Sequence, residues 1–220
     1  MDMRTRDRAA GAATLAATLY TVRALAGQSR YADALCLCDW LIDSIEAGDV
    51  NEVNDAGDVD AVSGVSEVSA VSEQSGAAPT AADAWRQRAA LRSQLHDRPG
   101  AVADMQAVTA MCDRRPADFH ALGTLLLRGA ATAPAIAAFD RAITLCEESG
   151  AADCLHAALL YRASAHLKLA HLAAALRGAM RLPPGYGGWV PGEGMRAKEE
   201  LLSAAHAALE RRRAGRPWAR

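Results

Sequence analysis

The sequence predicts an all-α protein built from antiparallel helical hairpins that stack side by side. The first observation is a period of 34 residues in the middle of the chain, which relates Trp85 to Phe119 and Cys112 to Cys146. Such a period is typical of arrays in which each unit buries its apolar face against its neighbours. The second is composition: 51% of the 220 residues are hydrophobic but only 5% are aromatic. A core made mostly of alanine favours close helix packing over a sheet.

Residues 1–47 are expected to form a degenerate first hairpin. Their apolar positions match those of a later segment at a constant offset of 67 residues, which pairs Tyr31, Ala34, Cys38 and Leu41 with Arg98, Ala101, Met105 and Val108. A cleaved secretory signal is the alternative, because three arginines precede a weakly apolar run at 9–22. Asp2 and Asp7 interrupt the basic region, and the run is alanine and threonine rather than leucine, so we favour the hairpin.

Residues 48–80 differ from the rest of the chain. They hold seven acids and no Lys or Arg, and valine recurs every third residue through most of the segment. A period of three suits neither a strand nor a helix face, and the filler is Gly, Ser, Asp and Asn. We therefore predict a disordered acidic linker, with a strand added to a partner's sheet edge as the alternative.

Three hairpins are expected over residues 81–114, 115–148 and 152–182. In the second, Phe119, Leu122 and Leu126 recur at helical spacing, a turn follows at 129–132, and Pro134 lies near the start of the next helix. Pro183 and Pro184 end the third hairpin. A Gly/Pro loop is predicted over 183–194, followed by an amphipathic capping helix over 195–214 that covers the open end of the array.

The central pattern resembles the tetratricopeptide repeat (TPR), whose signature W-x2-L-G-x2-Y…A-x3-F is well defined. Here it reads Phe119-x2-Leu122-Gly123-x2-Leu126, followed by Ala135-x3-Phe139. The preceding copy runs from Trp85 to Ala101-x3-Met105, and it departs from the pattern at Arg88, where leucine is usual. The resemblance implies a TPR-like α-solenoid of antiparallel hairpins with a C-terminal capping helix.

In TPR arrays the first helix of each hairpin lines a concave groove that holds a peptide or helix of a partner. By that resemblance the partner-binding groove here consists of Arg86, Ser93, Gln94, His120, Thr124, Leu127 and Arg128. The two arginines favour an acidic client, because arginine grips carboxylates with two hydrogen bonds. Tyr186 and Trp189 in the Gly/Pro loop are the secondary candidates.

The sequence gives little indication of disulfides, bound metal, catalysis, or nucleic-acid or membrane binding. The five cysteines are odd in number and lack C-x2-C spacing, so we expect buried reduced thiols and a cytoplasmic protein. No metal-ligand motif, phosphate loop or nucleophile–base pattern is present, so we expect no metal, no cofactor and no catalytic residue. Outside the linker the charge is only mildly basic, and no apolar segment is long enough for a membrane, so neither nucleic acid nor membrane is expected as a partner.

The sequence therefore predicts a protein–protein interaction adaptor or scaffold rather than an enzyme. A small bacterial secretion chaperone of the tetratricopeptide class is the alternative, since such proteins have about three repeats and a terminal helix. An enzyme whose site leaves no mark in the sequence is a second alternative. Nothing in the sequence specifies an oligomeric state.

Overall fold

The computed structural model describes residues 3–48, 50 and 80–214, and these residues are mostly helical, as the sequence predicts. The predicted linker lies outside the described residues except at 48, 50 and 80. Two compact units form, one containing the helices before Asp113 and the other the elements after Arg114.

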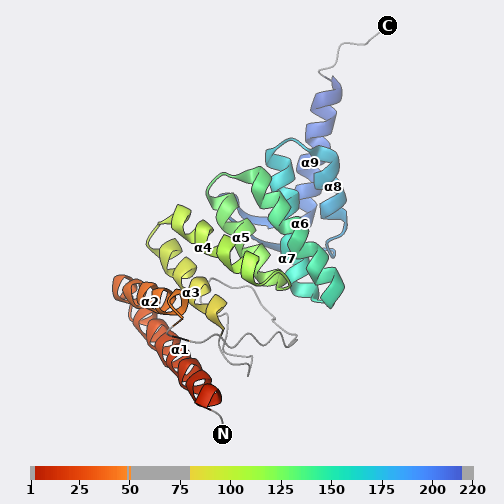
Figure 1. Ribbon diagram of the computed structural model, residues 1–220. Coiled ribbons are helices and arrows are strands. Elements are labelled where there is room, and N and C mark those ends of the chain that lie inside the picture. The colour runs from red at the N-terminus through yellow and green to blue at the C-terminus, as the bar shows by residue number, and fades with distance from the viewer. Residues whose placement is uncertain (1–2, 49, 51–79, 215–220) are drawn as a thin grey trace. The chain divides into compact units, whose positions relative to one another are not determined.

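The first unit consists of two helical hairpins (Figure 1). Helix α1 (Met3–Gly27) pairs with α2 (Tyr31–Glu46), and α3 (Ala81–Gln94) pairs with α4 (Arg98–Met111). Helix α3 also packs on both helices of the preceding hairpin. Val22, Ala34, Cys38 and Leu91 form a buried cluster where α1, α2 and α3 meet. The two hairpins of this unit therefore bury apolar side chains against each other.

Helices α3 and α4 begin where an aspartate side chain accepts a backbone amide near the helix start. The Asp83 carboxylate accepts the backbone N–H of Thr80 at 2.7 Å at the start of α3. Asp97 caps α4 by accepting the Gly100 amide at 3.0 Å, with Pro99 in the first turn.

The second unit continues the same pattern with α5 (Pro116–Arg128) and α6 (Thr132–Ser149), then α7 (Ala152–Lys168) and α8 (Leu172–Met180). Helix α7 packs on α5, α6 and α8, and α9 (Lys198–Ala214) packs on α7 and α8. Gly123 on α5 lies directly against Phe139 on α6, because a Cβ there would lie 2.6 Å from the Phe139 ring. The signature glycine and phenylalanine are thus packed against each other.

The four hairpin turns share one conformation. Each contains a non-glycine residue in the left-handed region, namely Ser29, His96, Ala130 and Ala170, with φ between 55° and 62°. In each, the amide of the following residue donates to a carbonyl five residues back, at 2.8–2.9 Å. This bond belongs to the common helix C-terminal motif, which usually uses glycine. Because these four residues are not glycine, the left-handed positions themselves give little signal in the sequence.

The Gly/Pro segment contains more structure than predicted. Residues 183–194 were expected to form a loop, but β1 (Gly187–Val190) pairs antiparallel with β2 (Gly194–Ala197). Strand β1 packs on α7, where Val190 is fully buried. The final helix accordingly begins at Lys198 rather than at residue 195. The short strands were not predicted because their glycines and the neighbouring prolines are typical of loops, and packing against α7 overrides that preference.

Candidate functional site

Helix α3 carries three of the predicted groove residues. Gln94 is exposed and Ser93 is half-buried. The Arg86 side chain is only 14% exposed, and its Nη1 lies 2.8 Å from Oδ1 of Asp83 on the same helix. Arg86 is therefore engaged in an ion pair within α3, so a carboxylate from a partner would have to compete with Asp83.

Helix α5 carries the other four, and two of these face the core. Leu127 belongs to the main hydrophobic cluster of the second unit, and His120 is buried. Thr124 is half-buried and donates its hydroxyl proton to the His120 carbonyl at 2.9 Å. Of the four, only Arg128 is exposed. Their spacing along α5 puts all four on one face of the helix, and α7 packs against part of that face.

His120 lies within an aromatic cluster. Its ring centroid is 5.0 Å from that of Tyr161 on α7 and 5.7 Å from that of Phe139 on α6. Nε2 of His120 is buried and has no hydrogen-bond partner. Burial of the imidazole lowers the pKa of His120 to about 4, because the charged form would lose its hydration. The groove assignment predicts this histidine at the surface, whereas packing against Phe139 and Tyr161 buries it.

Tyr161 links the primary groove candidates to the secondary ones, and it was not among the predicted site residues. Its ring packs on His120, and its hydroxyl donates to the Trp189 carbonyl on β1 at 2.6 Å. Burial raises the pKa of Tyr161, while the Arg128 charge acts against that rise. One tyrosine on α7 thus connects α5 to the β-hairpin, although no repeat position marked it.

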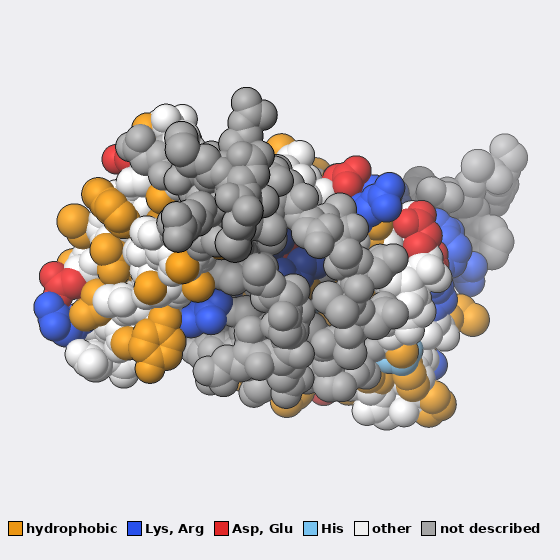
Figure 2. Space-filling model, turned by 60° about the horizontal axis from the view of Figure 1, so that its bottom comes forward, with side chains coloured by type: hydrophobic (Ala, Val, Ile, Leu, Met, Phe, Trp, Pro, Cys, Tyr) orange, Lys and Arg blue, Asp and Glu red, His pale blue; other side chains and the backbone are white. Residues whose placement is uncertain are grey.

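The outer face of the β-hairpin presents two large apolar side chains. Trp189 and Met195 are directly paired across the strands, and they are 65% and 67% exposed. Tyr186 is half-buried, with its ring 5.4 Å from that of His156. On the face of the molecule shown in Figure 2, hydrophobic side chains stand in small groups among charged and polar ones. Isolated exposed apolar residues are common on proteins, whereas a cross-strand pair of this size is a candidate contact surface.

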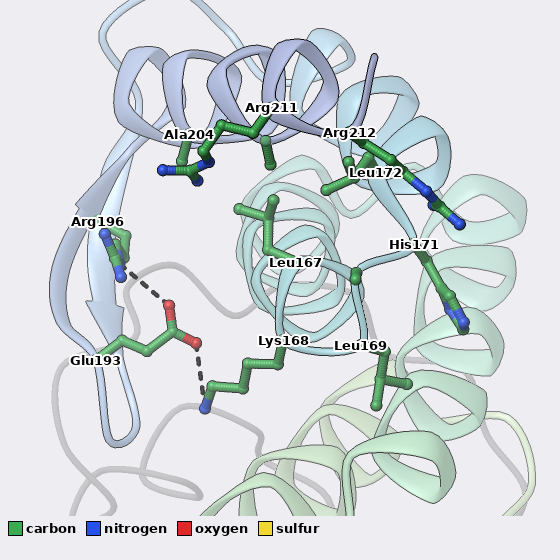
Figure 3. A pocket seen from close by; sticks show the side chains of 12 residues that line it. Leu167, Lys168, Leu169, His171, Leu172, Glu193, Arg196, Ala204, Arg211 and Arg212 are labelled. Carbon is green, nitrogen blue, oxygen red and sulfur yellow. Dashed lines mark hydrogen bonds and ion pairs between the residues drawn. The ribbon is translucent and has the colours of Figure 1, made fainter. Parts of the chain in front are cut away.

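A cleft of about 680 Å³ lies elsewhere in the second unit, between the α7–α8 turn, the β-hairpin and α9 (Figure 3). We call it the basic cleft, because its lining includes Lys168, His171, Arg196, Arg211 and Arg212 but only one acid, Glu193. The remaining lining is mainly apolar and consists of Leu167, Leu169, Ala170, Leu172, Ala204 and Ala208.

Glu193 neutralises part of the charge in the basic cleft. Its Oε1 lies 3.1 Å from Nζ of Lys168, and its Oε2 accepts a hydrogen bond from Nε of Arg196 at 3.1 Å. Arg211 reaches from α9 toward the side of the cleft where Arg196 lies, whereas Arg212 extends toward His171 (Figure 3). The cleft therefore combines an apolar lining with a net positive charge, which suits a ligand that is both acidic and partly apolar.

Arg88, which stands where the repeat signature has leucine, takes part in an ion network of the first unit. Arg88 and Arg92 on α3 both donate to Oδ1 of the buried Asp104 on α4, each at 2.8 Å. Nη1 of Arg88 also lies 3.0 Å from Asp39 on α2. At the equivalent positions 34 residues later, the chain has Leu122, Leu126 and Ala138 instead of the two arginines and the aspartate. The network joins three helices through ion pairs, so we assign it a structural role.

Among the described residues, no three His, Cys, Asp or Glu side chains are grouped so that they could hold a metal ion. Within the same part of the chain, no helix has the length and apolar character needed to cross a membrane. A comparison with protein-family models, curated proteins and solved structures finds no match for the chain.

Proposed function

We propose that this protein is an interaction adaptor of the tetratricopeptide class whose second unit holds an acidic segment of another protein. The observation that carries the proposal is the basic cleft, which has four Lys or Arg side chains and one acid around an apolar lining. Carboxylates of a bound segment would meet Arg211 and Arg212, and an aliphatic side chain would cover Leu167 and Leu172. Arginine is suited to this role because its guanidinium forms paired hydrogen bonds with carboxylates.

The arrangement of the hairpins supports the TPR assignment. Within each unit, a helix that opens one hairpin packs on both helices of the preceding hairpin, as α3 does on α1 and α2 and α7 does on α5 and α6. In the second unit, the core cluster contains Ala135 and Phe139, which the repeat signature specifies. An adaptor uses such a rigid scaffold to present surface residues rather than to perform chemistry.

The surface around Trp189 is a second candidate for the same function. Trp189 and Met195 offer an exposed apolar anchor, and tryptophan is enriched at interface hot spots. The Tyr161 hydrogen bond fixes the backbone of this hairpin against α7. A partner bound here would be recognised mainly through apolar contact, so its affinity would depend little on salt.

The experiment measures fluorescence anisotropy of a labelled peptide in which glutamates alternate with leucines. The variants are Arg211→Glu, which reverses a charge in the basic cleft, and Arg213→Glu, which makes the same change two residues away outside its lining. We expect Arg211→Glu to weaken binding about tenfold, or about 1.4 kcal/mol, and Arg213→Glu to have a much smaller effect. Binding should also weaken as salt rises.

Two outcomes would count against the basic cleft. Equal effects of the two substitutions would mean that only the general charge of α9 attracts the peptide. Loss of binding in Trp189→Ala, with Arg211→Glu unaffected, would move the site to the β-hairpin. Circular dichroism of each variant checks that the helices are retained.

A further inference from the structure

The two arginines of α9 that line the basic cleft point to different ends of it. Arg211 and Arg212 are neighbours in the last turn of α9, and consecutive residues of a helix are about 100° apart around its axis. Arg211 extends toward the end where Arg196 lies, and Arg212 extends toward the end where His171 lies (Figure 3). The cleft therefore has two ends, each with an arginine from the same helix.

Both of these arginines are available to a ligand. Arg211 and Arg212 are exposed, and among the described residues no acid pairs with either. The other two Lys or Arg side chains of the cleft, Lys168 and Arg196, are each paired with Glu193 at 3.1 Å. The cations of the cleft that lack an acidic partner are therefore Arg211 at one end and Arg212 at the other.

An apolar surface separates the two ends. Leu167 on α7 and Leu172 on α8 lie between the two guanidinium groups (Figure 3). Leu172 is buried and Leu167 is half-buried. Ala208, one turn before the arginines on α9, continues this surface. An aliphatic side chain in the middle of the cleft would be removed from water, whereas a carboxylate there would lose hydration without gaining a cationic partner.

We propose that the basic cleft recognises the order acid–apolar–acid in the segment that it binds. One carboxylate meets Arg211, the second meets Arg212, and the apolar side chain between them covers the two leucines. The inference rests on the proposed adaptor function and specifies which acidic segments the cleft accepts. In an extended segment alternate side chains share a face, so residues i, i+2 and i+4 would all face the cleft, with the two acids about 13 Å apart along the chain.

The test compares two peptides of identical composition, both capped at their termini so that the glutamates carry the only charges. One has the order Ser-Glu-Ser-Leu-Ser-Glu-Ser, and the other has the order Ser-Glu-Ser-Glu-Ser-Leu-Ser. Fluorescence anisotropy, with the dye in the N-terminal cap, measures the dissociation constant of each peptide from the full-length chain. We expect the first peptide to bind about tenfold more tightly, because only this order places one carboxylate at each end with the leucine between them.

Substitutions test the two ends separately. Arg211→Gln and Arg212→Gln should each weaken binding of the first peptide about fivefold. In the double variant the two effects should multiply, because the arginines meet different carboxylates. Arg213→Gln is the control, since it removes the same charge from the same turn of α9 but lies outside the lining of the cleft. This control should keep the preference for the first peptide, and circular dichroism checks that each variant retains its helices.

The outcomes separate this inference from the adaptor function. Equal affinity of the two peptides, with both still weakened by Arg211→Gln, would overturn the order preference and leave the adaptor function in place. A preference that persisted unchanged in the double variant would also overturn the inference, because the two arginines would then not set the order. If neither peptide bound, the adaptor function and this inference would both be wrong.

Discussion

Arg88 on α3 donates hydrogen bonds to both carboxylate oxygens of Asp104 on α4. Nε of Arg88 lies 3.1 Å from Oδ1 and 3.2 Å from Oδ2, and Nη2 lies 2.8 Å from Oδ1. Arg92 adds a further bond to the same oxygen. The Asp104 side chain is 3% exposed, so the two arginines replace the hydration that it loses on folding.

Removing only the Asp104 carboxylate should therefore destabilise the folded chain. Asp104→Ala leaves two mostly buried guanidinium groups without their main partner, and we expect the free energy of unfolding to fall by about 3 kcal/mol. Urea denaturation followed by circular dichroism measures this change.

A matched variant separates the contribution of the ion network to stability from the contribution of side-chain packing at the same positions. The combination Arg88→Leu, Arg92→Leu and Asp104→Ala copies the residues that the next repeat uses, and it leaves no buried charge behind because Asp39 is about half exposed. We expect stability close to that of the wild type or higher. If the triple variant were less stable than Asp104→Ala, the network itself would be the stabilising element.

Gly123 should not tolerate a side chain. Because a Cβ would lie 2.6 Å from the Phe139 ring, Gly123→Ala should lower the free energy of unfolding by about 1–3 kcal/mol. Gly27 near the end of α1 is the control, because a Cβ there meets nothing within 4 Å. Gly27→Ala should raise stability by up to about 1 kcal/mol. Thermal melts that shift equally in both variants would contradict the close approach of α5 and α6.

Mild acid should destabilise the second unit through His120. The pKa of this imidazole is about 4 in the folded chain, against 6.5 for an unperturbed histidine, so the unfolded chain binds the proton more tightly. Stability should fall as pH decreases from 6.5 to 4, by roughly 3 kcal/mol from this group, and change little from it below pH 4. Denaturation curves across this range measure the slope.

His120→Leu provides the control for that slope, because leucine is similar in size to histidine but does not titrate. Part of the slope should remain, since burial also lowers the pKa of His166. An unchanged slope in the variant would mean that other groups cause the acid sensitivity.

Tyr161→Phe should loosen the β-hairpin without unfolding the helices. The substitution removes the hydroxyl that donates to the Trp189 carbonyl at 2.6 Å, which should cost about 0.5–1.5 kcal/mol. Hydrogen exchange of amides in residues 187–197 should accelerate, because β1 and β2 form only a two-stranded sheet. Tyr20→Phe is the control, because Tyr20 is 75% exposed on α1. Unaltered exchange at the hairpin would show that Val190 packing alone holds it.

Local sequence determined where the helices form. The 34-residue period, the apolar spacing around Phe119 and Leu122, and the prolines near helix starts are properties of short segments, so they predict hairpins without knowledge of the rest of the chain. The TPR resemblance remains a prediction, whereas the mostly helical fold is confirmed. The helical register also put His120, Thr124, Leu127 and Arg128 on one face of α5.

Tertiary structure decided which of those residues reach solvent. Phe139 of α6 and Tyr161 of α7 pack on His120, and Leu127 belongs to the core cluster of the second unit. Contacts between residues far apart in the chain leave no mark in a local pattern. For the same reason, the sequence showed Arg88 only as a departure from the repeat signature, without its partner Asp104. The basic cleft could not be predicted from the sequence either. Its cations come from α7, β2 and α9 and the turn after α7. Side chains separated along the chain gain a common function only when the packing of these elements places them around one space.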